Sequence, residues 1–461
     1  MLKISAKKLR ITQITLTIIL LAVSFASFFS FNYFYSFGHI QNFGDAIFTL
    51  LQWLKLAGLV AIPVAVFLKT KRFDAPIKTL LVLTPLLSLF WTNQYINLAK
   101  IPVNSYQEIY WNLNMFMPKI LVLILFILQS VLMAIIATTL WLGGQKTEKT
   151  STQNRAQKTK QFANFLPIFL ITMPLNLFNN IFGEGRLVAP DSALYSFLKF
   201  KNFTVWHFLA LATVFFVTFL VYRFLKNKSS QTRYKYLRVL ALALLVQYMS
   251  KASMLIGDGY NVYYTILAFI PLFICNIGVP VAALAIFLKK KVLNNIAFFV
   301  HAAGALAVFV YFGRDEMSNF GTVFNYSFLY FCFTHCVLFM ICVLPTLLGE
   351  FKFRLRNSVI PMIYYAVVIF IAAAVSQFIT SMTGAKYGEV NAIYPNFAFT
   401  QNSPIANSLP VINVNIFGLN FDALYLSLLF VAYVIIFFVV YGGYYLIIER
   451  RKCFVKTKNV I

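Results

Sequence analysis

Residues 117–143 read MPKILVLILFILQSVLMAIIATTLWLG, with Lys119 as their one charged residue. About 20 apolar residues in an α-helix are enough to cross the ~30 Å hydrocarbon core of a bilayer. This stretch is therefore typical of a transmembrane helix. Comparable runs recur along the whole chain with mostly short polar connections, and they leave no segment for a separate soluble domain.

The composition excludes a water-soluble protein. Of the 461 residues, 60% are hydrophobic and 11% are charged, and the mean hydropathy is +0.77. We predict an all-α polytopic transmembrane bundle of twelve helices. The predicted spans are 11–35, 46–68, 76–97, 117–143, 162–182, 204–225, 236–257, 262–287, 292–312, 323–348, 358–379 and 422–448. The first span is longer than the ~7–15 apolar residues of a signal peptide and lacks a clear cleavage site, so we expect it to be retained.

Basic residues collect in alternate connections. Thirty of the 39 Lys and Arg fall in residues 3–10, 69–78, 146–160, 223–238, 289–291, 352–356 and 450–458. The positive-inside rule places this side in the cytoplasm, together with both termini. The net charge of +26 is then a topology signal and not a nucleic-acid surface. We expect a protein of the cell membrane whose partners are membrane lipids.

Two connections are longer than turns. Residues 144–161 are polar and basic, which predicts a flexible linker. Residues 380–421 form an outer connection with Tyr387, Tyr394, Phe397 and Phe399 among several asparagines. Its aromatic residues favour packing over the helix bundle, and a low-complexity spacer is the alternative.

Two kinds of residue stand out within the spans. Lys55, with Gln52 nearby, is deep in the span 46–68 and needs a partner or a water-filled pocket. The five cysteines, at 275, 332, 336, 342 and 453, all lie away from the outer connections. A disulfide framework is therefore not expected.

A thiol and two imidazoles share a depth in the predicted bundle. At 1.5 Å per residue, Cys275 and His335 lie roughly 20 and 18 Å inward from the outer ends of their spans. His301 falls near the same plane, and short connections between these three spans favour neighbouring positions. An imidazole that takes the proton of a thiol creates a thiolate nucleophile, the chemistry of acyl transfer. The alternative is ordinary packing of these residues in the core.

A metal site is the weaker interpretation of the same region. Cys332, His335 and Cys336 form a Cys-x-x-His-Cys pattern to which Cys275 could add a ligand. Adjacent helical residues point about 100° apart, so His335 and Cys336 suit one metal ion poorly. We expect neither a metal nor another cofactor.

Two motifs carry a family resemblance. Residues 270–277, IPLFICNI, resemble the Leu-Pro-Leu-x-x-Cys helix of the YwaF family of bacterial membrane proteins. Residues 330–335, YFCFTH, resemble that family's Tyr-Phe-x-x-x-His helix, and residues 203–207, FTVWH, resemble the start of its first core helix. The resemblance covers about residues 200–450. It divides the chain into an amino-terminal region, 1–199, of about five helices and a core, 200–461, of about seven.

The resemblance implies an activity. The YwaF family is similar to eukaryotic membrane proteins that include an acyltransferase remodelling ether phospholipids. Cys275 is then the acyl-accepting nucleophile and His335 its base, with His301, Asn276 and His207 in support. The outer connection lacks the family's Gly-x-Asn-Tyr stretch.

Two other functions stay open. A transporter or lipid-handling protein without covalent chemistry suits twelve helices, several Gly and Pro within the spans and the deep Lys55. A transferase that uses lipid-linked sugars ranks last, because Asp315-Glu316 is the one adjacent acidic pair available to it.

Overall fold

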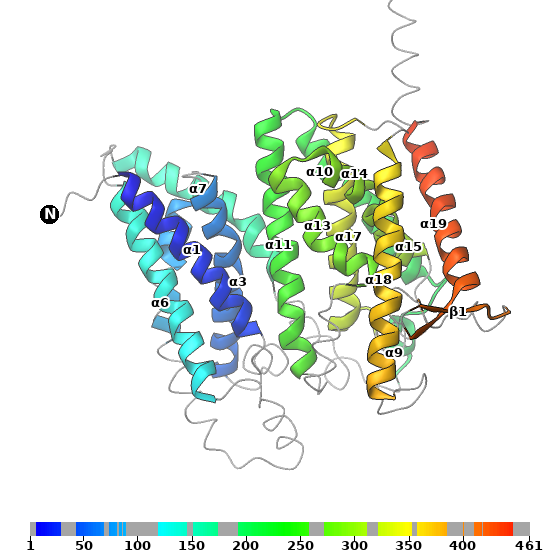
Figure 1. The fold of residues 1–461 in the computed structure, drawn as a ribbon. Helices are drawn as coiled ribbons and strands as arrows, with labels where there is room; N and C mark the ends of the chain where they lie inside the picture. Colours follow the sequence, from blue (N-terminus) through cyan, green and yellow to red (C-terminus); the bar gives the residue numbers. More distant parts are fainter. Residues whose placement is uncertain are drawn as a thin grey trace, which may run out of the picture. The chain divides into compact units, whose positions relative to one another are not determined.

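The computed structural model describes most of the chain. Described are residues 6–28, 43–68, 73–80, 83–84, 86–88, 119–144, 151–173, 192–257, 272–310, 321–352, 357–384, 400, 410–416 and 418–445. Within these ranges the fold is almost entirely helical (Figure 1). The chain divides into two compact units. Unit 1 holds residues 1–200, 238–266 and 319–330, and unit 2 holds the remainder.

Eight helices among the described residues are long and apolar enough to cross a membrane. They are α1 (Ala6–Phe28), α3 (Phe43–Phe67), α6 (Lys119–Gly144), α10 (Val205–Leu225), the run Lys291–Val310, α17 (Tyr326–Leu347), α18 (Val359–Thr383) and α19 (Ala423–Tyr444). Each overlaps a predicted span, which confirms a multi-pass helical membrane protein. The number twelve and the cytoplasmic side of the termini stay predictions.

Unit 1 is built on α1, α3, α6 and α7 (Ser151–Ile171), drawn in blue and cyan in Figure 1. Polar side chains link these helices inside the apolar core. Gln129 of α6 donates to Ser24 Oγ of α1 at 2.8 Å. Trp53 of α3 donates to the carbonyl oxygen of Phe169 in α7 at 2.6 Å, and the two rings stack with centroids 4.0 Å apart. A short helix, α9 (Ala193–Leu198), and the end of α11 (Ser230–Gly257) also belong to this unit.

The prediction of a flexible linker over residues 144–161 is wrong in part, because α7 is already helical from Ser151. Residues 151–161, STQNRAQKTKQ, are polar on every side, but Gln, Arg, Lys and Ala are good helix formers. The apolar turns that follow extend the same helix to Ile171.

Unit 2 surrounds a single helical run of three parts. These parts are α14 (Lys291–Ile296), the π-helix η2 (Ala297–Ala302) and α15 (Ala303–Val310). The helices α13 (Ile274–Leu288), α18 and α19 contact this run, and α10 contacts α15 (Figure 1). Near α19 the strands β1 (Asn413–Ile416) and β2 (Leu419–Asp422) pair as an antiparallel hairpin, with Val414 opposite Phe421.

Two predictions for unit 2 need correction. The helix expected over residues 262–287 does not include Leu272 and Phe273, because Phe273 has an extended conformation and α13 begins at Ile274. Residues 262–271 lie outside the described residues. The hairpin was not predicted within the outer connection. The four aromatic residues expected to pack there, at 387, 394, 397 and 399, lie outside the described residues.

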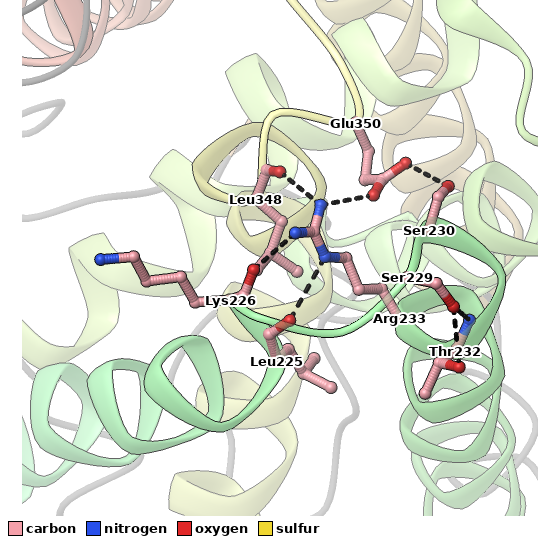
Figure 2. A network of polar contacts seen from close by, with 8 residues as sticks. All are labelled: Leu225, Lys226, Ser229, Ser230, Thr232, Arg233, Leu348 and Glu350. Atoms are coloured by element: carbon pink, nitrogen blue, oxygen red, sulfur yellow. Dashed lines mark hydrogen bonds and ion pairs between the residues drawn. The ribbon is translucent and has the colours of Figure 1, made fainter.

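A polar network joins helix ends in unit 2 (Figure 2). The Arg233 guanidinium donates to three carbonyl oxygens, those of Leu225 at 3.2 Å, Lys226 at 2.6 Å and Leu348 at 2.9 Å. It also pairs with Glu350 at 2.8 Å, and Ser230 Oγ donates to the second carboxylate oxygen at 2.6 Å. The last carbonyls of a helix have no intrahelical donor. Arg233 therefore caps the carboxyl ends of α10 and α17 together.

Candidate functional site

Cys275 is the second residue of α13 and is partly buried. Phe273 precedes the helix in an extended conformation. The Sγ atom lies 3.8 Å from Oδ1 of Asn276, which accepts the thiol hydrogen. Because α13 begins at Ile274, the Cys275 thiol lies beside the amide groups of the helix amino terminus. The first N–H groups of a helix lack intrahelical acceptors.

His301 fixes the backbone immediately before this cysteine. Its Nδ1 lies 2.9 Å from the carbonyl oxygen of Ile274, and its Nε2 lies 3.1 Å from the hydroxyl of Tyr364. A carbonyl can only accept, so Nδ1 carries the hydrogen and Nε2 accepts from the tyrosine. Both nitrogens of this fully buried ring are thus engaged. His301 lies in the π-helix η2, a geometry often found at functional sites.

Two glycines allow this close packing. A Cβ atom at Gly278 would lie 2.9 Å from Nδ1 of His301, and one at Gly304 would lie 2.9 Å from Cγ2 of Ile274. Real Cβ atoms do not come this near to such neighbours. The absence of both side chains lets α13 approach η2 and α15 at the turn that carries Cys275.

His335 has the same tautomer as His301, with its ring hydrogen on Nδ1. Its Nδ1 lies 2.8 Å from the carbonyl oxygen of Phe331, one turn earlier in α17. Nδ1 must therefore carry the hydrogen, which leaves Nε2 with a lone pair and the capacity to accept a proton. The buried ring packs on Phe331, at 4.1 Å between centroids, and on the edge of Phe309, at 6.4 Å.

His207 joins α10 to α15 by a hydrogen bond. The amide of Phe203 donates to its Nδ1 at 2.8 Å, so Nε2 carries the hydrogen and donates to the carbonyl oxygen of Phe309 at 2.8 Å. The first bond holds Phe203 in a left-handed conformation, with φ of 62°. The second bond ties α10 to α15 at the residue that contacts His335.

The candidate residues occupy one level of unit 2. Lys289, just after α13, lies with its Nζ 3.9 Å from the ring centroid of Tyr234, and the neighbouring Arg233 bonds the end of α17. The basic ends of α13 and α17 therefore lie together. Counting from Leu288 and Leu347 at 1.5 Å per residue, Cys275 lies about 20 Å and His335 about 18 Å from that end. The common plane of Cys275 and His335 stays a prediction.

The helix α15 contacts His335 and Ile274, the residue before Cys275. Gly304 faces Ile274, next to Cys275, and Phe309 packs on His335. These two positions of α15 are five residues apart, about 7.5 Å along the axis and about 140° around it. The contact with Ile274 and the contact with His335 therefore lie on different sides of α15.

One residue of this constellation was missed. Tyr364 of α18 binds Nε2 of His301, and nothing in the sequence distinguishes it from the other 24 tyrosines of the chain. Cys332 and Cys336 of α17 are partly buried. Within the described ranges, no three His, Cys, Asp or Glu side chains gather as metal ligands would.

The comparison with protein families decides the membership of this chain. A family model described as the TMEM164 family matches residues 197–441, which is more than half of the sequence. The chain belongs to the TMEM164 family. The matched part contains the four site positions Cys275, His301, His335 and His207, whereas the first 196 residues of this TMEM164 protein lie outside it. No curated protein matches the chain, and no solved structure matches it.

Proposed function

We propose that this TMEM164 family member is a YwaF-like acyltransferase of the cell membrane, in which Cys275 is the nucleophile and His335 the general base. The observation that carries the proposal is the hydrogen bond that Nδ1 of His335 donates to the carbonyl oxygen of Phe331. Of the three described imidazoles, His301 and His207 use both nitrogens as fixed contacts within the fold, whereas the bond from Nδ1 of His335 to Phe331 leaves Nε2 as a base.

The reaction begins with transfer of the thiol proton from Cys275 to Nε2 of His335. The thiolate attacks the ester carbonyl carbon of a phospholipid, and the carbonyl oxygen becomes an oxyanion. The amide groups at the start of α13 and the side chain of Asn276 are the nearest donors for that oxyanion. When the carbon–oxygen ester bond breaks, the imidazolium returns its proton to the leaving alkoxide, and a lysophospholipid departs.

After this first half-reaction, the acyl group remains on Cys275 as a thioester. The hydroxyl group of a second lysophospholipid gives its proton to His335 and attacks the thioester carbon. The new ester forms, the carbon–sulfur bond breaks, and the thiolate takes back the proton. Attack by water in place of the second lipid releases a fatty acid, which makes lipid hydrolysis the same chemistry with a different acceptor.

His301 serves this reaction as a positioning residue. Its hydrogen bond to Ile274 holds the turn that carries the nucleophile, and Tyr364 holds His301 in turn. Acyl transfer therefore requires no metal ion, because the thiol, the base and the amide donors supply the nucleophile, the proton acceptor and the oxyanion contacts.

The test is acyl exchange between a labelled phospholipid and a lysophospholipid by the purified full chain in liposomes. We expect Cys275→Ala and His335→Ala each to lose exchange, and the matched control Cys342→Ala, at a buried cysteine of the same unit, to retain it. Full exchange in both site variants would contradict the proposal. It would favour a transporter or lipid-handling protein without covalent chemistry.

A further inference from the structure

Unit 1 contains a buried lysine that the proposed reaction does not use. Lys55 is the thirteenth of the 25 residues of α3, and its side chain is 0% exposed. Twelve residues separate it from each end of the helix, a distance of about 18 Å at 1.5 Å per residue. A lysine side chain is too short to reach water from that depth. At that depth a charged ammonium group is costly unless a partner balances its charge.

The described residues of unit 1 do not supply that balance. No acidic side chain pairs with Lys55, and its Nζ has no hydrogen-bond partner within the described part of the chain. Its contact is with the face of Phe126 of α6, whose ring centroid lies 3.5 Å from Nζ. This cation–π contact covers one side of the ammonium and leaves its other N–H directions without an acceptor.

A second buried polar side chain lies near Lys55. Gln52 lies one turn earlier on the same face of α3, is 0% exposed, and has both side-chain amide atoms unpartnered among the described residues. An ammonium and an amide nitrogen provide hydrogen-bond donors, and such a pair suits an oxyanion.

The apolar residues around Lys55 indicate which kind of molecule bears the oxyanion. Leu51 and Phe126 form a buried apolar cluster against which Leu87 and Leu123 pack. A ligand that reaches this depth gains by burying apolar surface of its own. A single carboxylate balances the single charge of Lys55, whereas a phosphate monoester brings about −1.5 to −2 charges.

We propose that Lys55 and Gln52 bind the carboxylate of a long-chain fatty acid, with its acyl chain along the apolar cluster of unit 1. The site lies outside residues 197–441, the part that matches the family model. It therefore represents a function of the amino-terminal helices, and it does not depend on acyl transfer at Cys275.

The experiment measures thermal unfolding of the purified full chain in detergent, with oleate, oleyl alcohol or inorganic phosphate added. We expect oleate to raise the melting temperature of wild type saturably, and oleyl alcohol and phosphate to leave it unchanged. Lys55→Met should bind oleate about 10- to 100-fold more weakly, because it keeps the apolar length and removes the charge. Without ligand, the same variant should melt at a higher temperature than wild type, because a buried charge is removed.

Lys158→Met is the matched control, because Lys158 is an exposed lysine of α7 in the same unit, and it should respond to oleate as wild type does. If oleyl alcohol raised the melting temperature as much as oleate does, the effect would come from apolar partitioning alone, and the proposal would be overturned. A Lys55-dependent response to phosphate alone would overturn the fatty-acid assignment. Unchanged oleate binding by Lys55→Met, or none by wild type, would also refute the site.

A second measurement keeps the proposal testable if Lys55→Met does not fold. A fatty acid with a photoreactive diazirine in its chain should label peptides of α3 or α6 in wild type, and an excess of oleate should suppress the labelling. Labelling confined to other helices would exclude the site. Parallel measurements on Cys275→Ala separate this proposal from acyl transfer, because that variant should bind oleate normally.

Discussion

Three histidines of unit 2 show how hydrogen bonds assign different roles to one type of side chain. In His207 and His301 both ring nitrogens are engaged with groups of the fold, at distances between 2.8 and 3.1 Å. In His335 the Nδ1 atom donates to a backbone carbonyl, as Nδ1 commonly does in catalytic histidines, and Nε2 is the basic nitrogen. These contacts are the reason why we propose His301 as a positioning residue and His335 as the base.

His335→Asn tests this assignment. The asparagine amide can replace the Nδ1 donor to Phe331 but offers no basic nitrogen. We expect acyl exchange to fall about 10²- to 10⁴-fold while the melting temperature stays close to that of wild type. Activity assays paired with thermal unfolding measure both quantities. An active His335→Asn protein would remove His335 from the role of base.

At the scale of elements, close helix packing positions Cys275. The α13 turn with Cys275 lies against η2 and α15, at Gly278 and Gly304 respectively. The chain reaches this arrangement through the start of α13 at Ile274 and a π-helix around His301. Neither feature can be derived from hydrophobic periodicity, which predicts continuous helices through both regions.

Gly278→Ala tests the close approach. The added methyl group would lie 2.9 Å from Nδ1 of His301, so the ring or the helix must shift. We expect a loss of about 1–3 kcal/mol in unfolding free energy together with reduced acyl exchange. Gly442→Ala is the control, because a Cβ atom there meets nothing within 4 Å and alanine is the better helix former. Equal stability of the two variants would contradict the packing described for α13.

Arg233→Lys tests the cap on α10 and α17. Lysine keeps the charge, but its single ammonium cannot reach the four acceptors that the planar guanidinium binds. We expect a destabilisation of about 1–3 kcal/mol, measured by denaturant unfolding in detergent. Lys226→Ala leaves its backbone carbonyl in place, and its side chain points away from the network in Figure 2, so it should be neutral. Loss of stability in that control alone would reject the cap.

The whole molecule combines a matched core with additional amino-terminal helices. Residues 197–441 carry the TMEM164 family match and include Cys275 and His335, and the helices before them include Lys55. Hydropathy predicted the membrane-spanning helices well, because lipid requires long apolar helices whatever the function. The common depth of Cys275 and His335 stays a prediction, because it was counted along a helix over 262–287 and α13 begins at Ile274.

The sequence did not predict several individual side-chain contacts. Sequence placed Lys55 deep in a helix, but only the structure shows its ammonium over Phe126. The tautomer of His335 depends on the carbonyl of Phe331, and the anchoring of His301 depends on Tyr364. Such contacts are set by side-chain directions in the assembled bundle, which periodicity does not determine. The helical start of α7 was missed because polar composition was read as a linker.

The distribution of basic residues predicts on which side of the membrane the two termini lie. Thirty of 39 basic residues fall on one side of the predicted topology, so both termini should lie in the cytoplasm. Epitope tags at the amino and the carboxyl end of the full chain should react with antibody only after cells are permeabilised. A tag accessible in intact cells at one end would require an odd number of spans.

The most direct measurement is detection of the acyl-enzyme itself. The purified full chain is incubated with phosphatidylcholine liposomes, quenched in acid, digested and analysed by mass spectrometry. The account predicts a hydroxylamine-sensitive acyl adduct on the peptide with Cys275 in wild type, and none on that peptide in His335→Asn. A wild-type protein that exchanges acyl chains without any adduct on Cys275, or with the adduct on Cys332 or Cys336, would contradict it.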